Sequence, residues 1–176
     1  MAWTGRRPPS RIETGRLVLR RHALDDAVPL NAAVNASAEE LRPFVPWAID
    51  LPHTLEQTRA LLERYVAGFD ADESYGYGIF DLGERELLGG AALLPRIGPG
   101  ALEIGYWVAS GASGRGVATE AAAALVETGF AVGAEWLELH IDPANAASLR
   151  IPPKLGFAPV PEEAADLLVF RRLRAA

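Results

Sequence analysis

The spacing of apolar residues changes period along the first part of the chain. A short β-like run at residues 17–19 is followed by helical spacing over residues 25–34. A second helical pattern covers residues 54–69, and Thr54 with Gln57 at its start is a pair typical of a capping box. This region therefore predicts one strand followed by two or three helices.

The middle of the chain is typical of antiparallel strands. Strand-like runs cover residues 75–82 and 86–94, and residues 83–85 between them indicate a hairpin turn. A second tight turn at residues 98–100 precedes a third run over residues 102–108. These segments predict an antiparallel meander.

Helical spacing returns over the alanine-rich residues 118–132, whose small-residue face would let the helix lie close to a sheet. A strand is expected at residues 136–141, a second helix at residues 146–155 and a last strand at residues 167–170. Two prolines must distort the last turn of that second helix. The order predicts an α+β or mixed α/β domain in which helices cover a largely antiparallel sheet.

Length and composition narrow the class of protein. The 176 residues are 49% hydrophobic and 23% charged, which suits one globular domain. We expect residues 1–12 to form a loose N-terminal arm and residues 13–176 to form the domain. Apolar runs such as residues 121–126 are too short to span a bilayer. We therefore expect a cytoplasmic protein with no membrane partner.

Charge and residue types exclude several kinds of site. The net charge of -6 disfavours general nucleic-acid binding. Arginines crowd both ends of the chain, which favours ion pairs, with a phosphate- or RNA-facing patch as the alternative. The chain has no cysteine, so disulfides and thiolate sites are excluded. The histidines His22, His53 and His140 lack ligand spacing, so we predict no metal site.

A glycine-containing loop precedes the predicted helix at residues 118–132. It consists of Ser113, Gly114, Arg115, Gly116, Val117 and Ala118. Helix N-termini expose unpaired N–H groups, and glycines let the backbone approach an anion closely. The loop is therefore a candidate phosphate site with Arg115 as an added cation, and a plain tight turn is the alternative.

Two other phosphate-binding loops fit this segment poorly. A Walker A loop ends in Gly-Lys-Ser/Thr, and the sequence contains no such run. A Rossmann fingerprint requires a third glycine where Thr119 stands, inside an early βαβ unit. Here the loop follows an antiparallel meander instead.

Four segments, in order, resemble the GNAT superfamily, specifically its branch of RimJ/RimL-like protein N-terminal acetyltransferases. Residues 13–20 look like the opening strand of that branch, and residues 41–47 are similar to its proline–tryptophan segment. Residues 104–121 look like its central strand and pyrophosphate loop, and residues 145–157 resemble its final cofactor helix. The likeness runs from about residue 12 to the C-terminus.

The resemblance implies a GNAT fold, with six or seven strands in a largely antiparallel sheet and helices on both faces. It implies that acetyl-CoA binds in a V-shaped split between the strand ending at Val108 and the strand starting at Trp136. It also implies direct acetyl transfer to an amine. The cofactor-binding residues implied are Trp107, Val108, Ala109, Ser113, Gly114, Arg115, Gly116, Val117, Ala118, Thr119, Asn145 and Ser148.

The chain departs from the family pattern at two positions. Ser113 stands where the family loop usually has Gln or Arg, so phosphate affinity depends more on Arg115 and the backbone N–H groups. Pro152 stands where many members have the tyrosine that protonates the leaving thiolate. The usual general acid is therefore absent from this position.

Residue types suggest how protons move. An amine must lose a proton to attack a thioester, and Glu103 is the predicted base, with an arginine-paired solvated glutamate as the alternative. Ser148 is the predicted proton donor to the thiolate, unless it only bonds to its own helix. A backbone N–H near Val108 would stabilise the oxyanion. Asn145 is expected to join the helix start to the pantetheine arm, or to act as an N-cap.

We expect Phe44, Trp47 and Tyr106 to line the acceptor pocket. His140 shares a strand face with Glu138, and a structural role is favoured for it over that of a base. The predicted function is metal-free, acetyl-CoA-dependent N-acetylation of a protein or peptide α-amine. The alternatives are a small-molecule amine or antibiotic as acceptor and, in another class, a non-catalytic CoA-binding module. Homodimerisation is left open.

Overall fold

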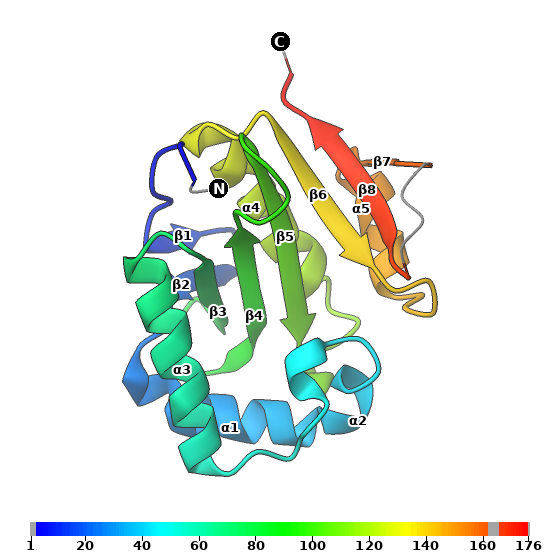
Figure 1. Ribbon diagram of the computed structural model, residues 1–176. Coiled ribbons are helices and arrows are strands. Elements are labelled where there is room, and N and C mark those ends of the chain that lie inside the picture. The colour runs from blue at the N-terminus through cyan, green and yellow to red at the C-terminus, as the bar shows by residue number, and fades with distance from the viewer. Residues whose placement is uncertain (1–2, 162–165, 176) are drawn as a thin grey trace.

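The computed structural model describes residues 3–161 and 166–175. One sheet runs through the molecule in the order β1-β2-β3-β4-β5-β6-β8-β7 (Figure 1). Its strands are β1 (Arg11–Glu13), β2 (Leu17–Arg21), β3 (Tyr75–Asp81), β4 (Leu87–Leu94), β5 (Ala101–Val108), β6 (Trp136–Ile141), β7 (Ala158–Pro159) and β8 (Leu168–Leu173). The α-helices are α1 (Ala27–Ala36), α2 (Ala38–Leu41), α3 (Leu55–Asp70), α4 (Val117–Val132) and α5 (Ile151–Lys154). The 3-10 turns are η1 (Leu24–Asp26), η2 (Pro46–Ala48), η3 (Ser110–Ala112) and η4 (Ser148–Arg150).

The predicted class, a mixed sheet covered by helices, is confirmed. The expected count of six or seven strands is corrected to eight. Two of these strands, β1 and β7, have only three and two residues, which is too short for an alternating pattern to reveal. The capping box at the start of α3 is present, because Gln57 N–H donates to Thr54 and Thr54 N–H donates to Gln57.

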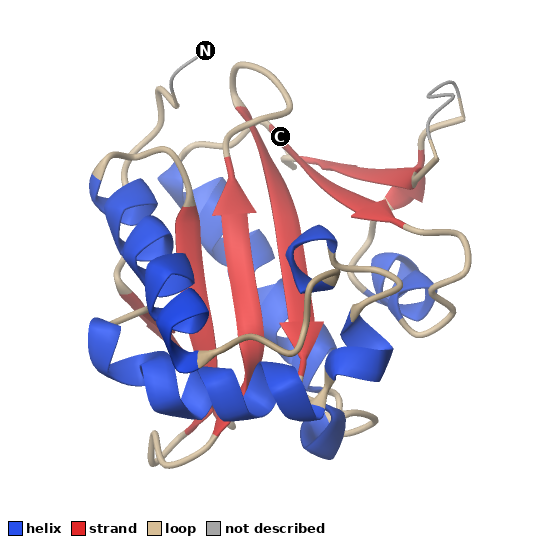
Figure 2. Ribbon diagram, turned by 60° about the horizontal axis from the view of Figure 1, so that its bottom comes forward, coloured by secondary structure: helices blue, strands red, loops and turns tan. Residues whose placement is uncertain are grey.

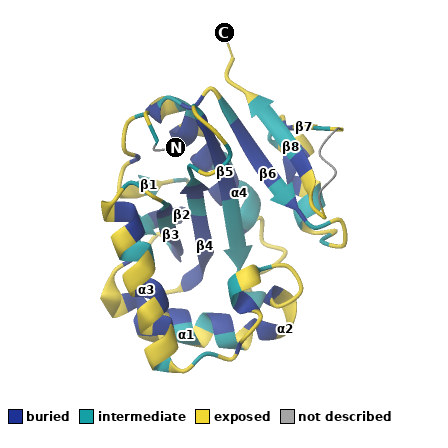
Figure 3. Cartoon of the chain, viewed as in Figure 1, coloured by how far each residue is buried: buried dark blue, intermediate teal, exposed yellow. Residues whose placement is uncertain are grey.

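Helices lie on both faces of the sheet and bury two apolar clusters (Figures 2 and 3). On one face α4 packs its small residues against β5, as with Ala121 and Ala122 near Leu102 and Ile104. On the other face α1 and α3 pack against the sheet, with Leu30 of α1 in the second cluster. Alanines let α4 approach closely, so the first half of β5 is buried beneath it.

The strands β5 and β6 separate along their length. All other strand pairs are antiparallel, but β5 and β6 are parallel and pair only from Ala101 with Trp136 to Glu103 with Glu138. Beyond Glu103, the side of β5 that faces β6 has no partner strand among the described residues. The V-shaped split expected between these two strands is therefore present.

The helix expected over residues 146–155 is present only in part. The chain forms the short turn η4 and the four-residue helix α5 instead. Pro152 and Pro153 lack the N–H groups that a continuous helix needs, and their rings clash with preceding carbonyl groups. Both occupy the first turn of α5, where a missing N–H has no cost.

Residues 3–10, which the sequence analysis expected to be a loose arm, make specific contacts. The Arg6 N–H donates to the carbonyl of Val132 at 2.8 Å. Arg7 forms an ion pair with Asp72 at 2.7 Å, and Tyr77 donates from its hydroxyl to the Pro9 carbonyl.

In the part of the chain that the structure describes, no helix has the length and apolar content needed to cross a membrane.

Candidate active site

Two glycines with a left-handed backbone shape the loop before α4. Gly114 has a φ of 74°, and Gly116, which caps α4, has a φ of 77°. The first N–H groups of an α-helix have no partner within the helix. In this 16-residue helix, no side chain among the described residues caps them. The helix dipole makes the same end positive. The loop that the sequence predicted therefore fits a phosphate group, and the exposed Arg115 lies within it.

A second arginine, which the sequence analysis did not assign to the site, supports this loop. Arg16 donates to the Arg115 carbonyl at 3.1 Å and to the Glu120 carboxylate at 2.7 Å. Thr14 also donates to Glu120, the acidic residue in the first turn of α4. Burial raises the pKa of Glu120, but these hydrogen bonds outweigh burial and hold the pKa below its usual range. Arg16 thus offsets a negative charge that would repel phosphate.

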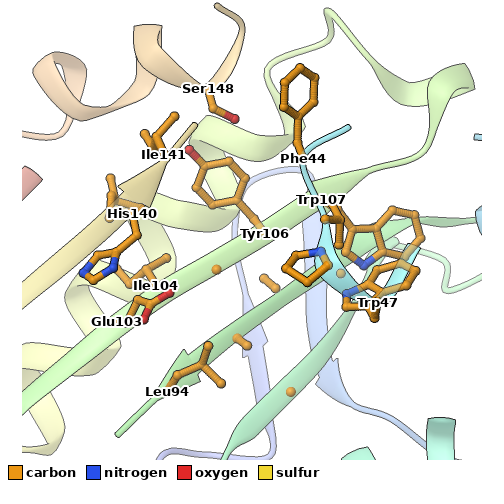
Figure 4. A pocket seen from close by; sticks show the side chains of 18 of the residues that line it. Phe44, Trp47, Leu94, Glu103, Ile104, Tyr106, Trp107, His140, Ile141 and Ser148 are labelled. Atoms are coloured by element: carbon orange, nitrogen blue, oxygen red, sulfur yellow. The ribbon is translucent and has the colours of Figure 1, made fainter. Parts of the chain in front are cut away.

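Tyr106 and Ser148 meet inside the split (Figure 4). The Tyr106 hydroxyl is buried and makes no well-formed hydrogen bond with the described residues. Burial raises the pKa of Tyr106 to about 12, against a smaller lowering effect of the nearby Ser148. The hydroxyl therefore keeps its proton at neutral pH and lies beside the residue predicted to protonate the thiolate.

Asn145 holds the turn that carries Ser148. Its Oδ1 accepts the Ser148 N–H at 3.1 Å, and its carbonyl accepts the Leu149 N–H at 3.1 Å. The capping contact that the sequence analysis gave as an alternative is thus present. Both Asn145 and Ser148 line the same cavity as Tyr106, so this turn faces the split.

The split opens into a cavity of about 530 Å³ on the face of the sheet that carries α1 and α3. Its floor consists of small residues on three neighbouring strands, namely Gly76, Gly90, Ala92 and Gly105. The predicted pocket residues Phe44, Trp47 and Tyr106 all line it, together with Glu103 and Trp107. The loop residues 113–119 do not line it, because they follow the C-terminal end of β5 and lead into α4, which covers the opposite face of the sheet.

Gly90 makes room for one wall of the cavity. A Cβ atom at this position would lie 2.4 Å from Nε1 of Trp107, the residue paired with Gly90 on β5. The Trp107 ring meets that of Trp47 edge to face, with ring centroids 5.8 Å apart. Aromatic pairs favour this geometry. The glycine therefore fixes the position of the Trp47–Trp107 wall.

Glu103 lies at the base of the split and is bound by an arginine. Arg96 donates to both of its carboxylate oxygens, at 2.7 Å and 2.6 Å. The arginine pairing that the sequence analysis allowed is present, but the carboxylate is buried rather than solvated. Such a two-pronged ion pair is a strong contact.

A second carboxylate lies beside Glu103. Glu138 is its direct partner on β6, so both side chains lie on the same face of the sheet. Arg171 on β8 donates to one oxygen of Glu138 at 2.7 Å, and His140 Nε2 donates to the other at 2.8 Å. The sequence showed that Glu138 and His140 share a face, but the arginine comes from a strand 33 residues away.

His22 and Tyr65 close the far end of the cavity. Their rings stack with centroids 5.4 Å apart. Burial lowers the pKa of His22 to about 4, although Asp26 opposes this. The ring is therefore neutral at pH 7.

Within the described ranges, no cluster of His, Cys, Asp and Glu side chains could hold a metal ion.

Comparison with known proteins agrees with this geometry. A sequence model of the family described as "Acetyltransferase (GNAT) domain" matches residues 16–158. The chain therefore belongs to the GNAT acetyltransferase family, and the predicted family and acetyltransferase domain are confirmed.

Among individual relatives, the chain is 32% identical over 109 residues to "Probable N-acetyltransferase YjcK" of Bacillus subtilis. That match spans 60% of this chain and 60% of the relative.

Solved structures share the fold. The acetyltransferase MccE of microcin C7 self-immunity, in complex with acetyl-CoA and AMP, has a TM-score of 0.83 at 16% identity and covers 96% of this chain and 98% of its own. RimL, a ribosomal L7/L12 α-N-protein acetyltransferase in complex with coenzyme A, has a TM-score of 0.81 at 20% identity, covering 93% and 97%. RimJ of Mycobacterium smegmatis has a TM-score of 0.77 at 21% identity, covering 89% and 81%.

Proposed function

We propose that this chain transfers the acetyl group of acetyl-CoA to the α-amine of a protein or peptide. The observation that carries the proposal is the continuous path from the β5–β6 split into the cavity on the sheet face. A donor bound in the split and an amine in the cavity would meet beside Tyr106 and Ser148.

The residues of the loop and of β5 are suited to hold acetyl-CoA. The unpaired N–H groups at the start of α4, with Arg115, would bind the pyrophosphate. The loop residues proposed are Ser113, Gly114, Arg115, Gly116, Val117, Ala118 and Thr119. The unpaired side of β5, through Trp107, Val108 and Ala109, would bind the pantetheine arm with Asn145. The cofactor supplies the activated acetyl thioester.

The side chains in the split are suited to assist the departure of the thiolate. Ser148, beside the protonated Tyr106 hydroxyl, is the proposed proton donor. A backbone N–H near Val108 is proposed to stabilise the negative oxygen of the transition state. Glu103 remains the predicted base, although Arg96 donates to both of its carboxylate oxygens.

A cytoplasmic location and the domain boundary at residue 13 also remain predictions.

The cavity supports a peptide acceptor because its floor residues on three strands carry no side chain larger than a methyl group. An extended backbone could lie along such a floor with its amine directed into the split. The similarity of the fold to RimL and RimJ supports the same reading, since the former is described as an α-N-protein acetyltransferase.

A small-molecule amine is the second candidate acceptor, and the Trp47–Trp107 wall favours it. Indole rings provide a surface on which a flat ring can stack. The related fold of MccE was solved in complex with AMP, a molecule with such a ring. A nucleotide-bearing amine is therefore the small molecule to test first.

The experiment is a measurement of thiol release from acetyl-CoA with a panel of acceptors. The panel contains peptides with N-terminal Ser, Ala or Lys, the same peptides with blocked N-termini, and aminoacyl nucleotide analogues. Acetylation of the free α-amine, located by mass spectrometry, is the expected result. Acetylation of the nucleotide analogues alone would move the assignment to the second candidate. Tight CoA binding without thiol release for any acceptor would identify a non-catalytic CoA-binding module.

A further inference from the structure

His140 lies at the point where β5 and β6 separate. The last residue pair of the two strands is Glu103 with Glu138, and His140 comes two residues later on the same face of β6. Its side chain is 23% exposed and lines the cavity near Glu103 (Figure 4). On β5, the floor residue Gly105 carries no side chain that could cover this region.

The ring of His140 is oriented by a carboxylate behind it. Glu138 is 4% exposed and accepts from Nε2 of His140 at 2.8 Å. Arg171 holds the other oxygen of Glu138 at 2.7 Å and 2.5 Å. Because a carboxylate accepts from Nε2, that nitrogen carries the proton of the neutral ring, and Nδ1 is left with a free electron pair.

Nδ1 of His140 has an electron pair available to accept a proton, whereas Arg96 occupies both carboxylate oxygens of Glu103. Among residues 3–161 and 166–175, none donates a hydrogen bond to Nδ1 of His140. This atom is therefore unpaired, but it is not fully buried. Glu103 accepts two hydrogen bonds from Arg96, so it could take up a proton only by loosening that ion pair.

We propose that His140 accepts the proton of the attacking amine through Nδ1, and that Glu138 is a positioning residue for its ring. This inference rests on the proposed acetyl transfer. The amine nitrogen forms a bond to the acetyl carbon, and the carbon–sulfur bond breaks with its electron pair on sulfur. One proton passes from nitrogen to Nδ1, and the sulfur takes one from the Ser148–Tyr106 side. Imidazolium then releases its proton to water, and water returns one proton to the Ser148–Tyr106 pair, so both groups regain their starting protonation.

The charged groups around His140 suit this role. On its own strand it contacts Glu138, and Asp142 follows two residues later. From β8 comes Arg171, and from the β5 side Glu103 with Arg96. The carboxylate that touches the ring would stabilise an imidazolium, while both arginines are engaged with carboxylates. General bases of this kind contribute about 100-fold to 10,000-fold to rates.

The test compares four variants at three residues, with the best acceptor of the panel above. His140→Gln should lower kcat by about 100-fold with CoA affinity unchanged. Exogenous imidazole should restore part of the activity of His140→Ala. Glu103→Gln should lower kcat by less than about fivefold, and the control His53→Gln, on a histidine outside the cavity, should leave it unchanged. A His140→Gln enzyme within threefold of wild type, or a Glu103→Gln enzyme with the larger loss, would overturn the proposal.

A second measurement does not require activity. The ¹⁵N chemical shifts of His140 in the CoA-bound protein should show the tautomer protonated at Nε2, and Glu138→Gln should shift the ring toward a mixture. A ring protonated at Nδ1 would refute the assignment. The proposed peptide acceptor and the proposed role of His140 can fail separately. If only small molecules are acetylated, the peptide acceptor is overturned. The same variants then test His140 with that small molecule as acceptor.

Discussion

The phosphate loop and the cavity recognise their ligands by different means. The loop, between β5 and α4, offers backbone N–H groups from consecutive residues, shaped by Gly114 and Gly116. The cavity, on the face of the sheet opposite α4, is built from side chains of segments far apart in the chain, such as Trp47, Glu103 and His140. A backbone site depends on glycine and on a helix start, both of which are local features of sequence. A side-chain site depends on the whole fold.

This difference between a backbone site and a side-chain site indicates where amino-acid substitutions are tolerated. A cofactor shared by a family can be held by main-chain atoms, which substitution of exposed side chains leaves in place. An acceptor that differs between members must be read by side chains, which can change one at a time. We therefore expect substitutions at the loop to affect CoA, and substitutions in the cavity to affect the acceptor.

The largest effect is expected at Gly116. Valine there would have to adopt the φ of 77° that side chains rarely adopt, and its Cβ would lie 3.3 Å from Nη2 of Arg16. Gly116→Val should weaken CoA binding at least 100-fold, about 2.8 kcal/mol, as measured by calorimetry. Gly111→Val is the matched control, since a Cβ at Gly111 meets nothing within 4 Å. Equal CoA affinity in both variants would contradict the phosphate site.

A smaller effect, felt mainly by the acceptor, is expected at Gly90. Its added methyl group would displace the Trp107 ring, which lies 2.4 Å from the position of a Cβ. Gly90→Ala should raise the KM for the acceptor about tenfold, or about 1.4 kcal/mol, and should change CoA affinity by less, although Trp107 is also a proposed cofactor contact. Gly105→Ala adds the same methyl group 3.9 Å from its nearest neighbour and should have a smaller effect. If Gly90→Ala weakens CoA binding more than acceptor binding, the two sites are not separable.

The smallest effect concerns stability and pH at the far end of the cavity. The folded pKa of His22 is lowered to about 4, below the ordinary histidine value of 6.5. The unfolded chain therefore binds a proton that the folded chain does not, and stability falls as pH drops from 6.5 toward 4. Between pH 7 and pH 5.5 the loss should be about 1 kcal/mol of unfolding free energy. Urea unfolding of wild type and His22→Gln measures it, and equal pH slopes would rule out this origin.

Sequence predicted the features that depend on neighbours in the chain. The capping box of α3, the strand at Trp136–Ile141 and the glycine loop all follow from residues within a few positions of one another. The helix expected over residues 146–155 is shorter and irregular, limited to η4 and α5, because Pro152 and Pro153 interrupt the helical pattern. The strands β1 and β7 were missed because pairing, not pattern, defines elements of two or three residues.

The site itself could be predicted only in part. Glu103, Trp47 and Ser148 were expected in one place, and the structure brings them into one cavity. The arginine partners of Glu103 and Glu138 could not be foreseen, since cross-strand register decides them. Periodicity assigned Glu138 and His140 to one face but could not show that they are bonded.

The contact between Arg16 and Glu120 bears on the order in which the molecule assembles. It joins residues 104 positions apart, so the support of the phosphate loop forms only after a very long segment has closed. Contacts of such high separation slow folding. A nascent chain would therefore lack a competent nucleotide-binding end until α4 has docked beside the first strands. CoA would bind the finished fold alone and raise its melting temperature as the logarithm of its free concentration above Kd.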